Sequence, residues 1–76
     1  MTYKEFQELK ERVNWGEEFL IYHNQLGYWI SQNQKGVYFT RNHDSFTQEF
    51  INSEELFEKA MIENRYLKDI YNEIEW

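Results

Sequence analysis

The chain has 76 residues, with 14 acidic and 8 basic side chains, a formal net charge of −6 and no cysteine. This length predicts one domain, residues 1–76, that gains its stability from packing, because no disulfide is available. The negative charge argues against direct binding to a nucleic-acid backbone, and the lack of a long apolar run argues against a membrane span or a secretion signal. We therefore expect a soluble, cytoplasmic protein.

The first predicted element is a helix that begins at Thr2. In the sequence TYKE, the Thr2 hydroxyl can accept a hydrogen bond from the Glu5 amide while the Glu5 carboxylate accepts one from Thr2, which is a capping box. One apolar stripe follows at helical spacing and consists of Phe6, Leu9 and Val13. Gly16 is the predicted end of the helix, because glycine adopts the left-handed conformation at little cost.

Three segments rich in β-branched and aromatic residues come next, at residues 18–23, 28–33 and 36–42. The turn sequences NQLG and NQKG separate them and predict an antiparallel meander of two hairpins. Residues 46–50, with alternating Phe46, Gln48 and Phe50, form either an extended segment or a short fourth strand.

The C-terminal part is predicted to be helical, with Asn52 or Ser53 as its N-cap. One apolar stripe contains Leu56, Ala60, Leu67, Ile70, Tyr71 and Ile74. Glu63 falls on that stripe and Asn64 tolerates the left-handed conformation, so we predict a break within residues 62–65 and two shorter helices. The expected fold class is α+β, in the order α-β-β-β-α-α.

The aromatic residues of the meander are candidates for a binding surface. Alternation places Tyr28 and Ile30 on one face of the second strand and Trp29 on the other, so both faces carry apolar bulk. If helices cover one face, then either Trp29 and Tyr38, or Tyr28 with its neighbours, stay exposed for a partner. The candidate aromatic site is therefore Tyr28, Trp29 and Tyr38. The alternative is that helices cover both faces.

A second candidate surface is acidic. Residues 44–76 carry nine acidic and three basic side chains and thus the whole net charge. The candidate partner-binding carboxylates are Glu54, Glu58, Asp69 and Glu73. Arg65 and Lys68 interrupt this row. It is either an ordinary solvated surface or a surface that attracts a basic protein.

No pattern in the chain indicates catalysis, a cofactor or a metal. His43, Asp44 and Ser45 are consecutive, so they cannot converge as a catalytic triad and are interpreted as turn residues. His23 and His43 have no recognisable metal-ligand spacing. We expect a protein that is not an enzyme.

The segments LGYWISQNQKGVYFT and SEELFEKAMIENRYLKDIYNEIE resemble small, uncharacterised acidic proteins of Gram-positive bacteria and their phages. The resemblance implies the same α-β-β-β-α-α layout, with Asn64 where glycine is common, and implies no activity. In layout alone, the chain is also similar to acidic anti-CRISPR proteins, some of which mimic DNA to block a nuclease.

Together these observations favour a non-enzymatic protein-binding module with a basic protein as its partner. A phage-encoded inhibitor or DNA mimic acting on a basic nucleic-acid-binding protein, such as a CRISPR nuclease, is one form of this hypothesis. The alternative is a homo-oligomer, such as a homodimer, that associates through the aromatic sheet face.

Overall fold

The computed structural model describes all residues, from Met1 to Trp76. Its helices and strands, in chain order, are α1 (Tyr3–Asn14), β1 (Phe19–His23), β2 (Leu26–Asn33), β3 (Gly36–Arg41), β4 (Phe46–Phe50), α2 (Ser53–Lys59), β5 (Met61–Ile62), β6 (Arg65–Tyr66), α3 (Leu67–Ile70), the 3-10 turn η1 (Tyr71–Glu73) and β7 (Ile74–Glu75). The α+β class is confirmed.

The five-stranded sheet has the order β4-β3-β2-β1-β7, and every neighbouring pair is antiparallel. The predicted meander forms its centre, and residues 46–50 are indeed a fourth strand. The fifth strand, β7, was not predicted. It pairs Glu75 with Tyr22 and Ile74 with His23, so the end of the chain returns to the beginning of the sheet.

The N-terminal helix forms as predicted. The Thr2 hydroxyl accepts a hydrogen bond from the Glu5 amide at 3.1 Å, and the Glu5 carboxylate accepts one from the Thr2 amide at 2.8 Å. The helix ends before Gly16, whose φ of +113° suits a residue without a side chain.

Local turn chemistry sets the register of the two central hairpins. The β1–β2 turn places Asn24 and Gln25 at φ +48° and +68°, as a two-residue turn of type I′ requires. At the β2–β3 turn the Asn33 side chain instead accepts hydrogen bonds from the amides of Lys35 and Gly36. A Cβ on Gly36 would lie 2.5 Å from the carbonyl oxygen of Phe50, so only glycine fits against β4 there.

The C-terminal half departs from the predicted helical pair. The break within residues 62–65 is confirmed, but it is a β5–β6 hairpin whose turn residues Glu63 and Asn64 have φ of +52° and +67°. The Gln48 side chain bonds to both the amide and the carbonyl of Met61, at 2.9 and 2.8 Å, and this holds the chain extended. The second helix of the predicted pair is therefore only the four residues of α3, followed by η1.

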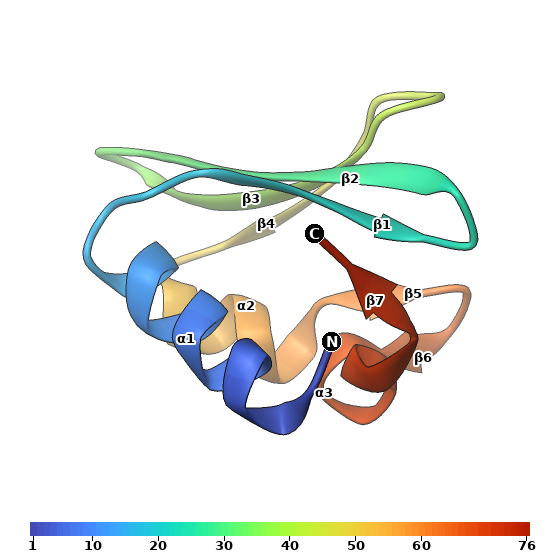
Figure 1. The fold of residues 1–76 in the computed structure, drawn as a ribbon. Helices are drawn as coiled ribbons and strands as arrows, with labels where there is room; N and C mark the ends of the chain where they lie inside the picture. Colours follow the sequence, from blue (N-terminus) through green and yellow to red (C-terminus); the bar gives the residue numbers. More distant parts are fainter.

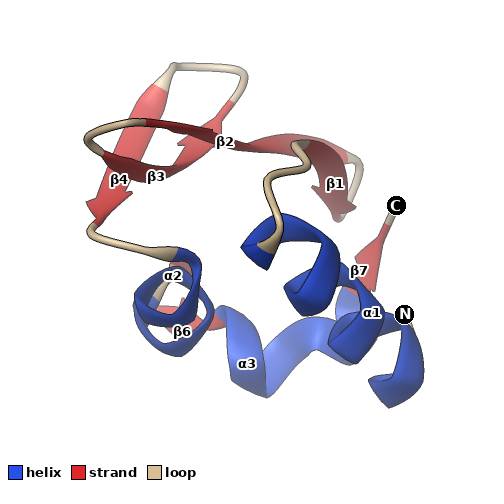
Figure 2. Ribbon diagram, turned by 90° about the vertical axis from the view of Figure 1, so that its left-hand side faces the viewer, coloured by secondary structure: helices blue, strands red, loops and turns tan.

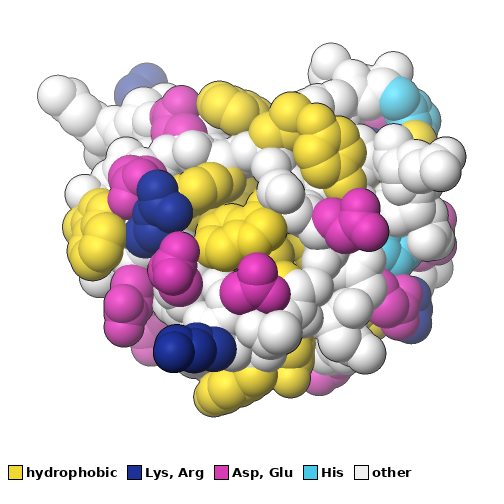
Figure 3. Space-filling view, viewed as in Figure 1, with side chains coloured by type: hydrophobic (Ala, Val, Ile, Leu, Met, Phe, Trp, Pro, Cys, Tyr) yellow, Lys and Arg dark blue, Asp and Glu magenta, His cyan; other side chains and the backbone are white.

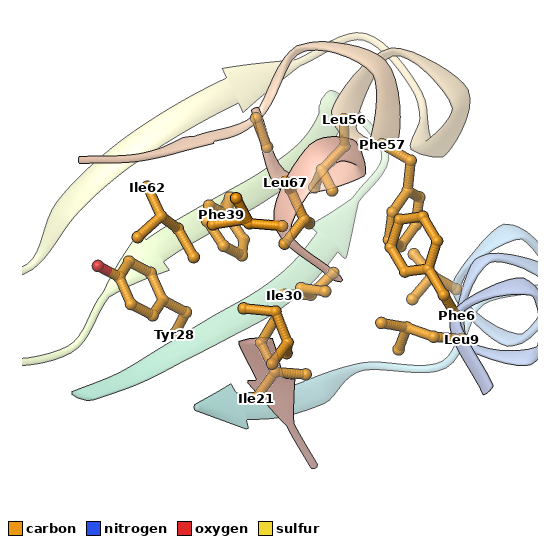
Figure 4. Packing of buried hydrophobic residues seen from close by; sticks show 14 of the residues in the cluster. Phe6, Leu9, Ile21, Tyr28, Ile30, Phe39, Leu56, Phe57, Ile62 and Leu67 are labelled. Atoms are coloured by element: carbon orange, nitrogen blue, oxygen red, sulfur yellow. The ribbon is translucent and has the colours of Figure 1, made fainter. Parts of the chain in front are cut away.

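Helices α1, α2 and α3 all lie on one side of the sheet, and the opposite face has no element over it (Figures 1 and 2). The buried hydrophobic residues form one core between the two layers: Phe6, Leu9, Val13, Ile21, Tyr28, Ile30, Val37, Phe39, Leu56, Phe57, Ala60, Ile62, Leu67, Ile70 and Ile74. Figure 4 shows the side chains of the strands pointing toward those of the helices. None of the helices has the length and apolarity needed to cross a membrane.

Candidate functional site

The structure shows which of the two sheet faces is exposed, a question that the sequence left open. Trp29 and Tyr38 point to this side, and Trp29 is 38% exposed. Tyr28 points to the helices, is 2% exposed and stacks on Phe39 with 5.1 Å between ring centroids. Burial raises the pKa of the Tyr28 hydroxyl. The prediction that includes Tyr28 in the exposed aromatic site is therefore wrong, because helices cover its face of the sheet.

The strand register shows which side chains share the uncovered side. Leu20 lies beside Trp29, Trp29 beside Thr40, and Ser31 beside Tyr38. We use the name outer sheet face for the residues whose side chains point there: Leu20, Tyr22, Trp29, Ser31, Asn33, Tyr38, Thr40, Thr47, Glu49 and Glu75. Hydrophobic side chains emerge over the sheet at the top of the molecule in Figure 3.

Tyr22 belongs to this face although it was not among the predicted site residues. It is 39% exposed, and its partner across the strand pair is Gly27. A Cβ on Gly27 would lie 3.6 Å from the Tyr22 ring, so the ring covers this glycine. The alternation of the strand sequence FLIYH and the length of the NQ turn are the signals from which Tyr22 could have been found.

The charged side chains of the outer sheet face are all acidic. Glu75 stands opposite Tyr22 on β7, and Glu49 stands opposite Tyr38 on β4. Neither carboxylate takes part in an ion pair. The five-stranded sheet contains one Lys or Arg, which is Arg41, and it pairs with Tyr28 and shares the inner face of that residue. The face is thus aromatic and uncharged at its centre, with a free carboxylate on each flank.

Two of the four carboxylates of the predicted acidic surface are already paired. Glu58 accepts a hydrogen bond from Lys68 at 2.7 Å, and this cation lowers the pKa of Glu58. Glu73 accepts bonds from Arg65 at 2.7 and 3.1 Å. Glu54 and Asp69 are exposed and have no such partner. Local cations therefore interrupt this surface.

His23, Arg65 and Glu73 form a cluster that brings together three distant segments. His23 is 1% exposed, and its Nε2 lies 3.0 Å from Glu73 Oε1, which also accepts from Arg65. The Arg65 and His23 hydrogen bonds lower the pKa of Glu73 to about 2. No nucleophile adjoins this cluster in the hydrogen-bond network, and its geometry holds the C-terminal segment against β1. Glu73 is thus a structural carboxylate as well as a predicted site residue.

The sequence His43-Asp44-Ser45 lies in the β3–β4 turn, as predicted. Asp44 accepts two hydrogen bonds from Arg41, at 3.0 and 2.7 Å, and one from the Phe46 amide. The Arg41 bonds lower the pKa of Asp44 to about 2. Its carboxylate is therefore committed to the turn. No group of three or more His, Cys, Asp or Glu side chains is arranged to hold a metal ion.

Comparisons of the chain with protein-family models, curated proteins and solved structures found no match. The resemblance to small acidic bacterial and phage proteins stays a prediction. The structure defines a two-layer α+β protein with one uncovered, aromatic and acidic sheet face.

Proposed function

We propose that this protein is a non-enzymatic protein-binding module that docks a basic protein on its outer sheet face. The observation that carries the proposal is the row of the exposed Tyr22 and Trp29 and the half-buried Tyr38 on a sheet face over which no helix lies. The Tyr38 hydroxyl donates a hydrogen bond to Asn33 Oδ1 at 3.0 Å, which holds the ring on this face. Tyr and Trp are the residues most enriched in interface hot spots, and contiguous exposed apolar patches usually mark an interface.

Charge supports a basic partner. Glu49 and Glu75 leave the outer sheet face negative, and the whole chain has a net charge of −6. Lys and Arg side chains of a partner would be attracted electrostatically to these carboxylates and would form cation–π contacts with the aromatic rings. Two copies of this chain docked face to face would bring four carboxylates together without a cation. Self-association through this face is therefore the less favoured alternative.

The outer sheet face supports binding better than the acidic surface of the C-terminal segments. A DNA mimic needs a continuous row of free carboxylates at phosphate-like spacing, whereas Lys68 and Arg65 already neutralise Glu58 and Glu73. We therefore propose protein binding without DNA mimicry. Inhibition of the bound protein would be a consequence of covering its basic surface.

The test is a parallel capture experiment from cell lysate with wild type and two matched variants. The first variant, Trp29→Thr with Tyr38→Thr, removes aromatic groups from the outer sheet face. The second, Glu54→Gln with Asp69→Gln, removes the two unpaired carboxylates of the other surface. We expect a basic protein that binds wild type and the second variant, is lost with the first and is released by added salt.

Three results would overturn the proposal. In the first, the variant with the Trp29 and Tyr38 changes still captures the partner. In the second, capture is lost only in the variant with the Glu54 and Asp69 changes. In the third, the only protein captured is further copies of this chain. Light scattering of the purified protein at several concentrations provides the control for self-association. Far-UV circular dichroism checks that each variant is folded.

A further inference from the structure

The aromatic and acidic groups of the outer sheet face form one line, and this arrangement limits what can bind if the face is a docking surface as proposed above. Glu75 and Tyr22 share the first row across the strands, Trp29 lies in the next row, and Tyr38 and Glu49 share the third. In strand order these residues come from β7, β1, β2, β3 and β4. The line therefore runs diagonally over the whole sheet, with a free carboxylate at each end.

Sheet geometry gives the length of this diagonal. Four strand spacings span about 19 Å across the sheet, and two steps of two residues span about 14 Å along it. The two carboxylate positions are thus separated by roughly 23 Å. An α-helix covers that distance in about 15 residues, or about four turns.

Hydrogen bonding of the partner's backbone favours a helix over an extended segment on this face. An extended segment lying flat on a sheet face meets side chains, so its amide and carbonyl groups find few regular partners. A helix satisfies these groups internally and offers an apolar stripe to the rings. The inner face of the same sheet is already packed against helices in this way (Figure 2).

We propose that the partner presents an amphipathic helix of about 15 residues along this diagonal, with Lys or Arg near both ends and an apolar stripe between them. Its terminal cations pair with Glu75 and Glu49, and its apolar stripe covers the line from Tyr22 through Trp29 to Tyr38. Each exposed charge pair contributes modestly, so the two together give about a tenfold preference for the correct charge spacing.

The test uses the intact purified chain and two synthetic helical peptides of identical composition and capped ends. One peptide carries its lysines at both ends. The other carries them in the middle, on the same face of the helix as in the first peptide. Nuclear magnetic resonance titration follows the indole N–H signal of Trp29, assigned by its loss in Trp29→Thr. Circular dichroism measures helix formation in the peptide.

We expect the end-charged peptide to shift the Trp29 signal, become more helical on binding and bind about tenfold more tightly than the other. The preference should vanish in Glu49→Gln with Glu75→Gln and persist in the matched control Glu54→Gln with Asp69→Gln. Equal affinities, a preference that survives the Glu49 and Glu75 changes, or absence of binding by either peptide would each overturn the helix proposal. If a lysate protein is nevertheless captured through Trp29 and Tyr38, the protein-binding function stands and only the helix proposal fails.

Discussion

Ile30 and Trp29 are neighbours on β2 that point to opposite faces of the sheet, so changing each in turn separates core packing from surface binding. Ile30 is 0% exposed, and Ile30→Ala removes three carbon atoms from the core. The transfer loss alone is about 2.4 kcal/mol, at about 0.8 kcal/mol for each buried carbon group. The residual cavity raises the expected loss of unfolding free energy to roughly 3 kcal/mol.

This loss is large for a domain of 76 residues, whose total unfolding free energy is about 4–11 kcal/mol. The melting temperature should fall by roughly 12–24 °C. Urea unfolding and thermal melts followed by far-UV circular dichroism measure both quantities without depending on tryptophan fluorescence.

The matched change is Trp29→Thr, which keeps a residue that favours strands but removes the exposed ring. We expect it to lower the unfolding free energy by only about 1 kcal/mol, because the ring packs on one side only. The same change should abolish partner capture while the chain stays folded. A stability loss for Trp29→Thr as large as that for Ile30→Ala would refute the assignment of Trp29 to an uncovered face.

Three further changes test individual features of the fold. Gln25→Gly should raise the urea midpoint, with a gain of about 0.5–1 kcal/mol, because the residue stands at φ +68° in a type I′ turn; an unchanged or lower midpoint would contradict this. Gly36→Ala should destabilise by about 1–3 kcal/mol, since its Cβ would lie 2.5 Å from the Phe50 carbonyl oxygen, and an unshifted thermal midpoint would count against that contact. Arg65 helps to lower the pKa of Glu73 from 4.5 to about 2, so the stability due to ionised Glu73 is present above pH 4.5 and is lost as the pH falls toward 2. Urea unfolding between pH 2 and 5 should therefore show a shallower decline for Glu73→Gln than for wild type, and identical slopes would argue against this role.

The elements that the sequence predicted correctly depend on groups a few residues apart. The Thr2–Glu5 capping box, the stripe of Phe6, Leu9 and Val13, and the turn residues of the hairpins act within one or two turns of chain. Even the break within residues 62–65 is local, because Glu63 interrupts the apolar stripe and Asn64 tolerates positive φ. These local patterns favour the same helix or turn wherever the segment lies in the fold, so they can be recognised in the sequence alone.

The candidate site could be predicted only in part, because it depends on contacts between segments that are far apart in the chain. Strand alternation correctly separated Tyr28 from Trp29, but both faces carried aromatic residues, so alternation could not tell which face the helices cover. The predicted carboxylates were placed on a helical wheel, whereas Glu73 lies in a 3-10 turn and pairs with Arg65. Its partner His23 is 50 residues away in the chain, a separation that no local pattern spans.

The sequence by itself thus determined the α+β class, the N-terminal helix, the antiparallel meander and the net negative charge, because propensity, capping and turn chemistry act locally and charge is a matter of composition. The tertiary structure alone decided that all helices lie on one face, that Ile74 and Glu75 add a fifth strand beside β1, and that Tyr22, Trp29 and Tyr38 stand in line between two carboxylates. These features depend on where distant segments meet. The helices pack on the inner sheet face because this buries their apolar stripes. Strand register then determines which residues are neighbours on the outer sheet face.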